Sequence, residues 1–387
     1  MGSLEADSRI EPGSGTDDIK KLYFEISSLC NLSCSMCFRH TWIDEGTGRL
    51  DADIVMKVLN EEAVLQTADT VFFGGMGEPL THPGAAGFIS AAHGKGKYTE
   101  LITNGTMLRQ KTSAALLESG LDRLWVSMDG FNRSTYENIR IGSRFDLITS
   151  NLDTFNNEKI RTGREDASIG ITFVASSENI SELKYLPEFM DRYNVSAINI
   201  SSMIPNSAEL EKIIIYDRIV GIYQGNLEDV TPFREYDIPA MDLRNNEIAE
   251  AYEAIKSRLA PSRVPKDRDL STKPWCRFVN EGNVFVSWDG DVVPCMGLLH
   301  SSYTNLYGTH RKVMRHSYGN VYKENLYDIW RKPDFTDFRE RVRNWDFSPC
   351  ILCGGCSNRE ENKEDCIGNQ EPTCGACIWA FNVASCP

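Results

Sequence analysis

Residues 21–37 have the sequence KLYFEISSLCNLSCSMC. The opening residues are mostly β-forming and predict a strand that leads directly into cysteines at positions 30, 34 and 37. Thiolates are the preferred protein ligands of iron–sulfur clusters. A loop this short can direct three sulfurs at one cubane and leaves its fourth iron open. We therefore predict a catalytic cluster on Cys30, Cys34 and Cys37, since a structural zinc loop normally has a fourth protein ligand.

Strands and helices alternate along residues 20–205. The β-forming runs predict strands at residues 21–26, 70–73, 100–103, 123–127, 169–174 and 197–201. Apolar residues at helical spacing predict helices at residues 51–66, 85–94, 109–119 and 181–193, with a further helix after Gly130. Such alternation implies a parallel sheet with helical crossovers. Six units can form an open or partial α/β barrel, in which the C-terminal ends of the strands carry the chemistry.

Length and composition limit the alternatives. The chain has 387 residues and a formal net charge of -14, which argues against a nucleic-acid-binding protein. No run approaches the roughly 18 apolar residues of a membrane span, and the polar N-terminus has no features of a secretory signal. We therefore expect a cytoplasmic protein. The expected parts are a flexible segment 1–18, the barrel 19–205, a helical connecting region 206–270 and a cysteine-rich domain 271–387.

The C-terminal tail is rich in cysteine, whereas no cysteine lies between positions 37 and 276. Because a reducing compartment disfavours disulfides, metal binding or catalysis is the better interpretation. Residues 285–290 (FVSWDG) predict a β-hairpin with an Asp-Gly turn. Two zinc sites that only stabilise the tail remain an alternative, because zinc knuckles have the same Cys-x2-Cys spacing. The tail cysteines are Cys276, Cys295, Cys350, Cys353, Cys356, Cys366, Cys374, Cys377 and Cys386.

The cysteine loop, followed by Phe38 and placed after the first strand of a partial barrel, resembles the radical SAM superfamily. In that family the open iron binds the amino and carboxyl groups of S-adenosyl-L-methionine (AdoMet). Reduction of the [4Fe–4S] cluster then cleaves AdoMet to methionine and a 5′-deoxyadenosyl radical, which takes a hydrogen atom from the substrate. The resemblance thus implies an enzyme with a partial (β/α)6 TIM barrel.

The same resemblance implies which residues contact AdoMet. The sequence GGMGEP at residues 74–79 looks like the family's glycine-rich motif for the AdoMet amino group. Arg140 matches an arginine that pairs with the AdoMet carboxylate in some relatives, with a solvated helix residue as the alternative. Asn104 either touches the ligand or makes a turn with Gly105. The implied AdoMet-binding residues are Phe38, Gly74, Gly75, Met76, Glu78, Asn104, Ser127, Asp129 and Arg140.

The tail resembles the SPASM domain, a cysteine-rich C-terminal domain that holds auxiliary [4Fe–4S] clusters. The resemblance implies a small β-hairpin, short helices and one or two auxiliary clusters. Two clusters need eight thiolates, so one of the nine tail cysteines is spare or an alternative ligand. By family order, Cys276, Cys295 and Cys366 serve the nearer cluster. Cys350, Cys353, Cys356 and one late cysteine serve the farther one, although the later spacings here differ from the family's C-x2-C-x5-C-x3-C run.

Two local stretches suggest a substrate class. Residues 37–42 (CFRHTW) and 372–380 (PTCGACIWA) are similar to SPASM proteins that act as maturases of tungsten-cofactor oxidoreductases. This implies a protein, peptide or tungstopterin-enzyme substrate, and a ferredoxin or flavodoxin as the reductant. Arg39, His40 and Trp42 would line the substrate side of the barrel, with packing of the cluster loop as the alternative for Trp42.

Other functions remain open from the sequence. The first alternative is modification of a ribosomal peptide by thioether formation, carbon–carbon cross-linking or epimerisation. The second is a non-catalytic iron–sulfur electron carrier. Formylglycine formation is disfavoured, because Met296 follows Cys295 where sulfatase-maturing relatives have an acidic base. The sequence identifies no catalytic base.

Overall fold

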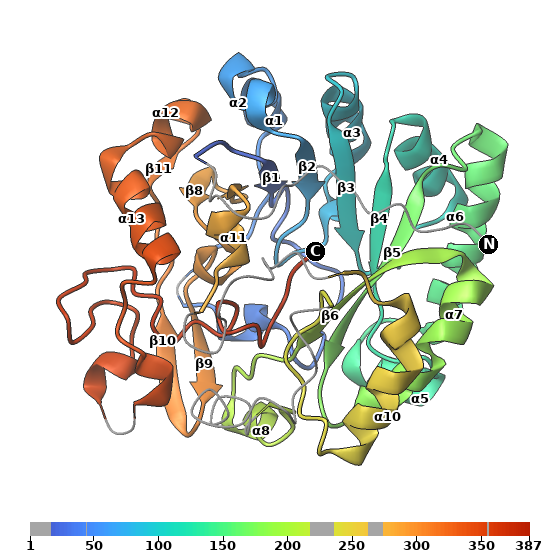
Figure 1. Cartoon of the computed structure of the whole chain (residues 1–387). Coiled ribbons are helices and arrows are strands. Elements are labelled where there is room, and N and C mark those ends of the chain that lie inside the picture. Colours follow the sequence, from blue (N-terminus) through green and yellow to red (C-terminus); the bar gives the residue numbers. More distant parts are fainter. Residues whose placement is uncertain (1–16, 44, 217–235, 262–273, 354–355) are drawn as a thin grey trace.

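A computed structural model describes residues 17–43, 45–216, 236–261, 274–353 and 356–387. Its main element is a nine-stranded sheet with the order β11-β8-β7-β1-β2-β3-β4-β5-β6. Strands β1 to β6 are parallel neighbours in chain order, which confirms the partial barrel (Figure 1). They are β1 (Lys21–Phe24), β2 (Thr70–Phe73), β3 (Tyr98–Thr103), β4 (Arg123–Ser127), β5 (Ser168–Ala175) and β6 (Val195–Ser202).

Helices connect these strands and follow the outside of the curved sheet (Figure 1). They are α1 (Ala52–Val58), α2 (Glu62–Thr67), α3 (Ala85–His93), α4 (Gln110–Glu118), α5 (Arg133–Ile139), α6 (Phe145–Thr162) and α7 (Leu186–Tyr193). The helix expected at 51–66 is interrupted, because the chain turns at Leu59–Glu61 and buries both Leu59 and Val64. The helix expected at 181–193 begins as the 3₁₀ helix η3 (Ile180–Tyr185), and Pro187 lies in the first turn of α7, where proline is favoured.

The predicted hairpin of the tail is present, and it also extends the barrel sheet. Strand β7 (Asn283–Val286) pairs in parallel with β1, and β8 (Asp291–Val293) pairs antiparallel with β7. The turn between them contains Gly290 at φ 85°, a conformation that glycine adopts without strain. Strand β1 therefore has one neighbour from the barrel and one from the cysteine-rich tail, a join that local sequence patterns did not predict.

The remaining described elements are short. A second hairpin consists of β9 (Ser302–Leu306) and β10 (Thr309–Val313), and β11 (Gly319–Asn320) pairs with β8. The expected helical region 206–270 contains α8 (Ala208–Glu211), α10 (Asn246–Ile255) and the 3₁₀ helix η5 (Lys256–Arg258), while residues 217–235 and 262–273 lie outside the described ranges. The tail adds α11 (Arg277–Asn280), α12 (Leu326–Trp330) and α13 (Pro333–Asn344). Further 3₁₀ helices are η1 (Phe38–Thr41), η2 (Pro79–Thr81), η6 (Met296–Leu298), η7 (Cys350–Leu352) and η8 (Ser357–Arg359).

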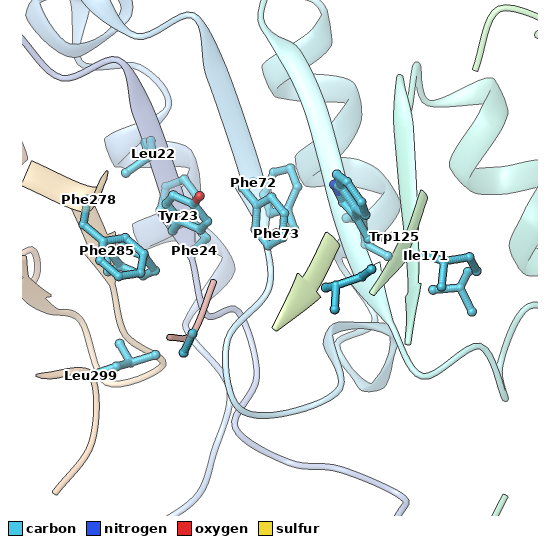
Figure 2. Packing of buried hydrophobic residues seen from close by; sticks show 14 of the residues in the cluster. Leu22, Tyr23, Phe24, Phe72, Phe73, Trp125, Ile171, Phe278, Phe285 and Leu299 are labelled. Carbon is cyan, nitrogen blue, oxygen red and sulfur yellow. The ribbon is translucent and has the colours of Figure 1, made fainter. Parts of the chain in front are cut away.

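Aromatic side chains pack the join between barrel and tail, as Figure 2 shows for Tyr23, Phe72 and Phe285. Tyr23 stacks on Phe285 with ring centroids 4.2 Å apart and lies 4.8 Å from the ring of Phe72. All three are almost fully buried, and removal of such a ring typically costs about 3–5 kcal/mol. The tail is therefore part of the hydrophobic core that positions the strand before the cysteine loop. Among the residues described, no helix has the length and apolar content to cross a membrane.

Candidate functional site: three groups of thiols around the barrel mouth

The three cysteines of the 30–37 loop are brought together just after β1. Each is partly exposed, and the amide of Cys37 donates to the carbonyl of Cys34 at 3.1 Å. Burial raises the pKa of Cys34, and the charges of Cys30 and Cys37 raise it further. The three thiols therefore lie close enough for their charges to interact. Because a cluster needs thiolates, iron binding here must displace protons. Three accessible thiols on one loop fit a cubane with one open iron.

The glycine-rich loop 74–79 lies against this cysteine loop. The amide of Glu78 donates to the carbonyl of Leu29 at 2.7 Å. A Cβ on Gly77 would lie 2.2 Å from the carbonyl oxygen of Ser27, and one on Gly75 would lie 2.5 Å from Glu25 Cγ. Real Cβ atoms do not approach so closely, so both positions require glycine. The glycines let the chain after β2 pass directly over the chain after β1.

Glu78 is buried at the end of the glycine-rich loop. Its carboxylate is 2% exposed and accepts hydrogen bonds from Leu80 N, Thr103 Oγ1 and Asn104 N at 2.7–3.0 Å. Burial raises the pKa of Glu78, although these bonds oppose the shift. In the structure Glu78 thus joins the ends of β2 and β3 and fixes the backbone of Asn104. The Asn104 side chain donates to Asn31 Oδ1 at 2.9 Å and reaches Cys30 Sγ at 3.8 Å.

Asp129 and Arg140 form a buried ion pair beside the cysteine loop. Arg140 Nε lies 2.5 Å from Asp129 Oδ2, and Arg140 Nη1 lies 4.0 Å from Cys34 Sγ. Asp129 is fully buried and also accepts from Val174 N at 2.8 Å. Although burial alone would lower the pKa of Arg140, the charge of Asp129 raises it. The alternative of a solvated Arg140 is therefore wrong. Ser127, at the end of β4, is buried and accepts from Thr172 Oγ1 at 3.3 Å.

Four tail thiols form a group that we call the near set, because Cys276 and Cys295 flank the strands β7 and β8 that join the tail to the barrel. Burial raises the pKa of Cys295 and of Cys374 well above the usual value, and the thiols that add to each shift are members of the same group. The amide of Trp275 donates to the carbonyl of Ala380 at 2.8 Å, which ties the two parts of the group together. The near set is Cys276, Cys295, Cys374 and Cys377.

The other group of tail thiols, the far set, is built around Cys350. Burial raises the pKa of Cys350, and the charges of Cys353 and Cys366 add to the shift. Cys366 Sγ lies 3.0 Å from the hydroxyl of Ser348, two residues before Cys350. Cys356 is exposed and belongs to the same segment. This grouping differs from the family order, because Cys366 lies with Cys350 while Cys374 and Cys377 lie with Cys276.

Cys386 is separate from both sets. Burial raises its pKa to about 11, and the charged groups that act on it are Lys21, Arg277 and Glu100, none of them a cysteine. The next residue, Pro387, accepts a hydrogen bond from Tyr23 Oη at 2.7 Å. Pro387 therefore packs against the barrel strands. Cys386 is the tail thiol that belongs to neither the near set nor the far set.

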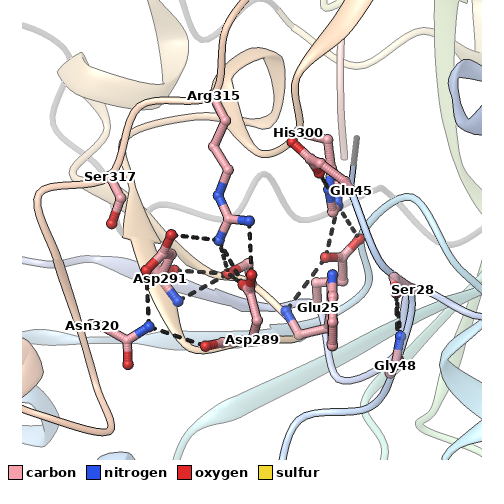
Figure 3. Close-up of polar contacts among 12 residues, drawn as sticks. Glu25, Ser28, Glu45, Gly48, Asp289, Asp291, His300, Arg315, Ser317 and Asn320 are labelled. Atoms are coloured by element: carbon pink, nitrogen blue, oxygen red, sulfur yellow. Dashed lines mark hydrogen bonds and ion pairs between the residues drawn. The ribbon is translucent and has the colours of Figure 1, made fainter. Parts of the chain in front are cut away.

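A buried histidine that the sequence analysis missed links the barrel to the tail (Figure 3). The side chain of His300 is 1% exposed, and it contacts Glu25, directly after β1, and Glu45. Burial alone would lower the pKa of His300, but these two carboxylates raise it to about 9. Glu25 also accepts from Met76 N at 2.9 Å, so the same carboxylate holds the glycine-rich loop. The available signal was the position of Glu25 at a strand end, where the other special residues gather.

Between the cysteine loop and the near set lies a small cavity that is partly open to solvent. Phe38 follows Cys37, Met296 follows Cys295, and Trp379 lies two residues after Cys377. Trp42 stacks on His300 with ring centroids 4.0 Å apart, so it is both a cavity wall and part of the packing. Arg39 lies over the Trp42 ring at 5.8 Å, and His40 Nε2 is 3.0 Å from Cys34 O. The lining residues are Phe38, Trp42, Met76, Met296, Gly297, His300, Ser302, Thr304, Val313 and Trp379.

The donor chemistry of all three groups fits iron–sulfur clusters, because every candidate ligand is a thiol. In the described part of the chain, no three His, Cys, Asp or Glu side chains converge on a point that one metal ion could occupy. A cubane presents a separate iron to each thiolate, so its ligands do not have to converge on one point.

Comparison with known proteins agrees with this geometry. The Radical SAM superfamily profile matches residues 24–196, and that of the SPASM iron–sulfur cluster-binding domain matches residues 276–357. The tungsten-containing aldehyde ferredoxin oxidoreductase cofactor-modifying protein of Pyrococcus furiosus is 31% identical over 376 residues, which covers 95% of this chain and 97% of that protein. The PqqA peptide cyclase of Gluconobacter oxydans is 24% identical over 371 residues, with 91% and 89% covered.

The fold is also shared with solved structures. Native anSMEcpe with bound AdoMet and Cp18Cys peptide has a TM-score of 0.58 at 16% identity, over 95% of this chain and 96% of that chain. Streptococcus suis SuiB bound to S-adenosylmethionine has a TM-score of 0.57 at 15% identity, over 87% and 71% of the two chains. This chain belongs to the radical SAM superfamily, as an enzyme that uses AdoMet with a [4Fe–4S] cluster and carries auxiliary iron–sulfur clusters in a SPASM domain.

Proposed function

We propose that this enzyme cleaves AdoMet reductively, removes a hydrogen atom from a tungsten-containing oxidoreductase or its tungstopterin cofactor, and so matures that enzyme. The main support is the likeness to the Pyrococcus furiosus protein, which extends over both the barrel and the tail. The observation that carries the proposal is the cavity, because Phe38, Met76 and Met296 bring the cysteine loop, the glycine-rich loop and the near set to one space. A group bound there lies beside AdoMet.

When bound, AdoMet and the cluster on Cys30, Cys34 and Cys37 supply the hydrogen-abstracting radical. The protein's own groups position the cofactor. Arg140 offers a buried cation for the AdoMet carboxylate, and Asp129 holds its guanidinium in place. The backbone of Met76 is fixed by Glu25, and Phe38 and Met296 supply apolar walls of the cavity.

The grouping of tail thiols supports two auxiliary clusters. The near set would hold one cluster with Cys276, Cys295, Cys374 and Cys377. The far set would hold the other with Cys350, Cys353, Cys356 and Cys366. Cys386 would remain a free thiol. The low-potential electrons would come from a ferredoxin or flavodoxin in the cytoplasm.

The test is anaerobic reaction of the reconstituted enzyme with AdoMet, dithionite and an immature tungsten-containing oxidoreductase. We expect 5′-deoxyadenosine, methionine and a mass change in the oxidoreductase or its extracted pterin, all by mass spectrometry. Deuterium transfer from substrate into 5′-deoxyadenosine would identify the site of abstraction. AdoMet cleavage without any change in the oxidoreductase or its cofactor would contradict the proposed substrate.

Peptide modification is the second candidate, and the whole-length likeness to PqqA peptide cyclase favours it. The same assay with a short candidate peptide separates the two. A substrate-dependent mass change in the peptide, with none in the oxidoreductase, would replace the first proposal with the second.

A further inference from the structure

Two arginines are buried between the tail elements without an acidic partner. Arg311 of β10 and Arg359 of η8 are each 8% exposed. Arg311 Nη1 donates to the carbonyl of Arg359 at 2.5 Å, and Arg359 donates to the carbonyls of Cys353 and Leu306 at 2.6 and 3.0 Å. Within the described residues neither guanidinium makes a salt bridge to Asp or Glu. Both guanidinium groups therefore donate their hydrogen bonds to uncharged carbonyl oxygens.

Other buried arginines in the described part of the chain lie beside carboxylates or an aromatic ring. Arg140 pairs with Asp129, Arg277 pairs with Asp237 and Glu281, and Arg339 lies over the ring of Trp330 at 3.7 Å. A buried charge without an opposite charge is costly, and arginine is rarely buried unless it is paired. The charges of Arg311 and Arg359 also repel one another. We therefore expect a bound anion close to the Arg311 guanidinium.

The groups that face Arg311 identify that anion. Arg311 lies beside the far set, because it donates to Arg359 O and Arg359 in turn donates to Cys353 O. The near set adjoins this segment, because Ile351 N donates to Gly375 O at 3.0 Å. The thiols of Cys350, Cys377 and Cys374 accordingly act on the Arg311 guanidinium, which lies close to both sets. Its strand is held there because Lys312 N donates to Glu360 O at 2.7 Å, which joins β10 to the segment that follows Cys356.

We propose that Arg311 is the shared counter-ion of the two auxiliary clusters and that its charge raises the reduction potentials of both. This inference rests on the proposed assignment of one cluster to each thiol set. A cluster held by four thiolates is an anion as a whole, and reduction makes it more negative. Nearby positive charge stabilises the reduced form, and net charge and surrounding hydrogen bonds are known to set cluster potentials. Arg311 would be a positioning residue that acts through the clusters.

The test is an anaerobic redox titration of the loaded full-length enzyme, monitored by electron paramagnetic resonance. In Arg311→Gln we expect the ratio of reduced to oxidised auxiliary cluster at a fixed potential to fall about tenfold, or ~59 mV for a one-electron couple. Arg311→Lys keeps the charge and should remain close to wild type. Arg331→Gln removes an exposed arginine of the same domain and serves as the control. The AdoMet-binding cluster, in the same sample, should keep its potential.

Each outcome either supports or contradicts the role of Arg311 as a counter-ion. Loss of the auxiliary clusters in Arg311→Gln but not in Arg311→Lys would also support the counter-ion, because charge alone separates the two variants. Fully loaded Arg311→Gln with unchanged auxiliary potentials would overturn it, as would equal cluster loss in both variants, which would indicate a steric role. Wild-type enzyme that binds only about four irons, instead of roughly twelve, would contradict the auxiliary clusters themselves. Formation of 5′-deoxyadenosine is measured separately and reports on the AdoMet-binding cluster alone.

Discussion

His300 Nε2 lies 2.9 Å from Glu25 Oε2, and this contact joins residues 275 positions apart in the chain. Glu25 follows β1, whereas His300 lies between the 3₁₀ helix η6 and β9 of the tail. The groups facing the imidazole are Glu25 and Glu45, and Arg315 lies close to Glu45 and pairs with Asp289 (Figure 3). A charged imidazole therefore connects the AdoMet side of the barrel with the domain of the auxiliary clusters.

This pair should make stability depend on pH. The folded pKa of His300, about 9, is above the unfolded value of roughly 6.5. Its contribution is fully present below pH ~6.5 and is lost as the pH rises towards 9, with a total of ~3 kcal/mol. We expect the unfolding free energy of wild type to fall over that range and that of His300→Gln to change much less. Anaerobic denaturation at several pH values measures this, and equal slopes for both proteins would refute it.

The cysteine loop should be required for AdoMet cleavage. Cys34→Ser is expected to abolish 5′-deoxyadenosine formation, because the cluster then loses one of its protein thiolates. Cys386→Ser is the matched control, since this thiol is also partly exposed but lies outside all three groups. Reductive cleavage is measured by mass spectrometry after addition of dithionite. Activity in Cys34→Ser comparable to that of Cys386→Ser would show that the cluster is elsewhere.

The grouping of the tail cysteines predicts iron content. The double variants Cys374→Ser/Cys377→Ser and Cys350→Ser/Cys353→Ser should each lose roughly four of about twelve irons, one cubane in each case. Cys386→Ser should lose none. Iron analysis and electron paramagnetic resonance check this. If Cys386→Ser loses a cluster and the Cys374/Cys377 variant does not, the grouping is incorrect.

The buried ion pair should stabilise both the fold and the AdoMet site. Asp129→Asn leaves Arg140 charged and unpaired, which should cost about 3–5 kcal/mol of unfolding free energy. The matched control is Asp153→Asn, whose partner Arg192 is exposed, so that the expected cost is at most about 1 kcal/mol. Denaturant titration gives both values, and equilibrium dialysis should show weaker AdoMet binding in Asp129→Asn only. Equal effects of the two substitutions would argue against a role for this pair.

Gly77 and Gly87 offer a test of the close approach between loops. A Cβ on Gly77 meets the Ser27 carbonyl at 2.2 Å, whereas a Cβ on Gly87 in α3 meets nothing within 4 Å. Gly77→Ala should displace the glycine-rich loop and weaken AdoMet binding at least tenfold. Gly87→Ala should leave binding unchanged and stabilise the helix by about 0.5–1 kcal/mol. Calorimetric titration with AdoMet measures both, and normal binding by Gly77→Ala would disprove the constraint.

The barrel could be predicted from the sequence because its signals are local. The strands observed at 70–73 and 123–127 have the predicted bounds, since a short buried strand followed by glycine or Asp-Gly leaves little freedom. Arg140 could not be decided, because its position at the end of α5 fits both a solvated and a buried residue. Only the tertiary position of Asp129 settles that choice.

Relationships between distant residues could not be predicted. The grouping of tail thiols depends on how the tail folds back, and Gly375 packs so closely that a Cβ would lie 1.9 Å from the carbonyl oxygen of Ser348. That contact holds Cys374 next to the segment of Cys350, while its thiol lies near those of Cys276 and Cys377, an arrangement that spacing alone does not give. The partnership of Glu25 with His300 is of the same kind, since neither residue carries a periodic or motif signal.

The position of β1 between β2 and β7 has a consequence for biosynthesis. During translation β1 can pair with β2 after about 70 residues, but its other neighbour is Asn283–Val286 and emerges much later. Until then one edge of β1 is unpaired, and the strand that leads into Cys30 lacks half of its support. The ribosome must therefore deliver the first strand of the tail before β1 has both of its neighbours. We expect the cysteine loop to reach its final geometry only after that strand has been made.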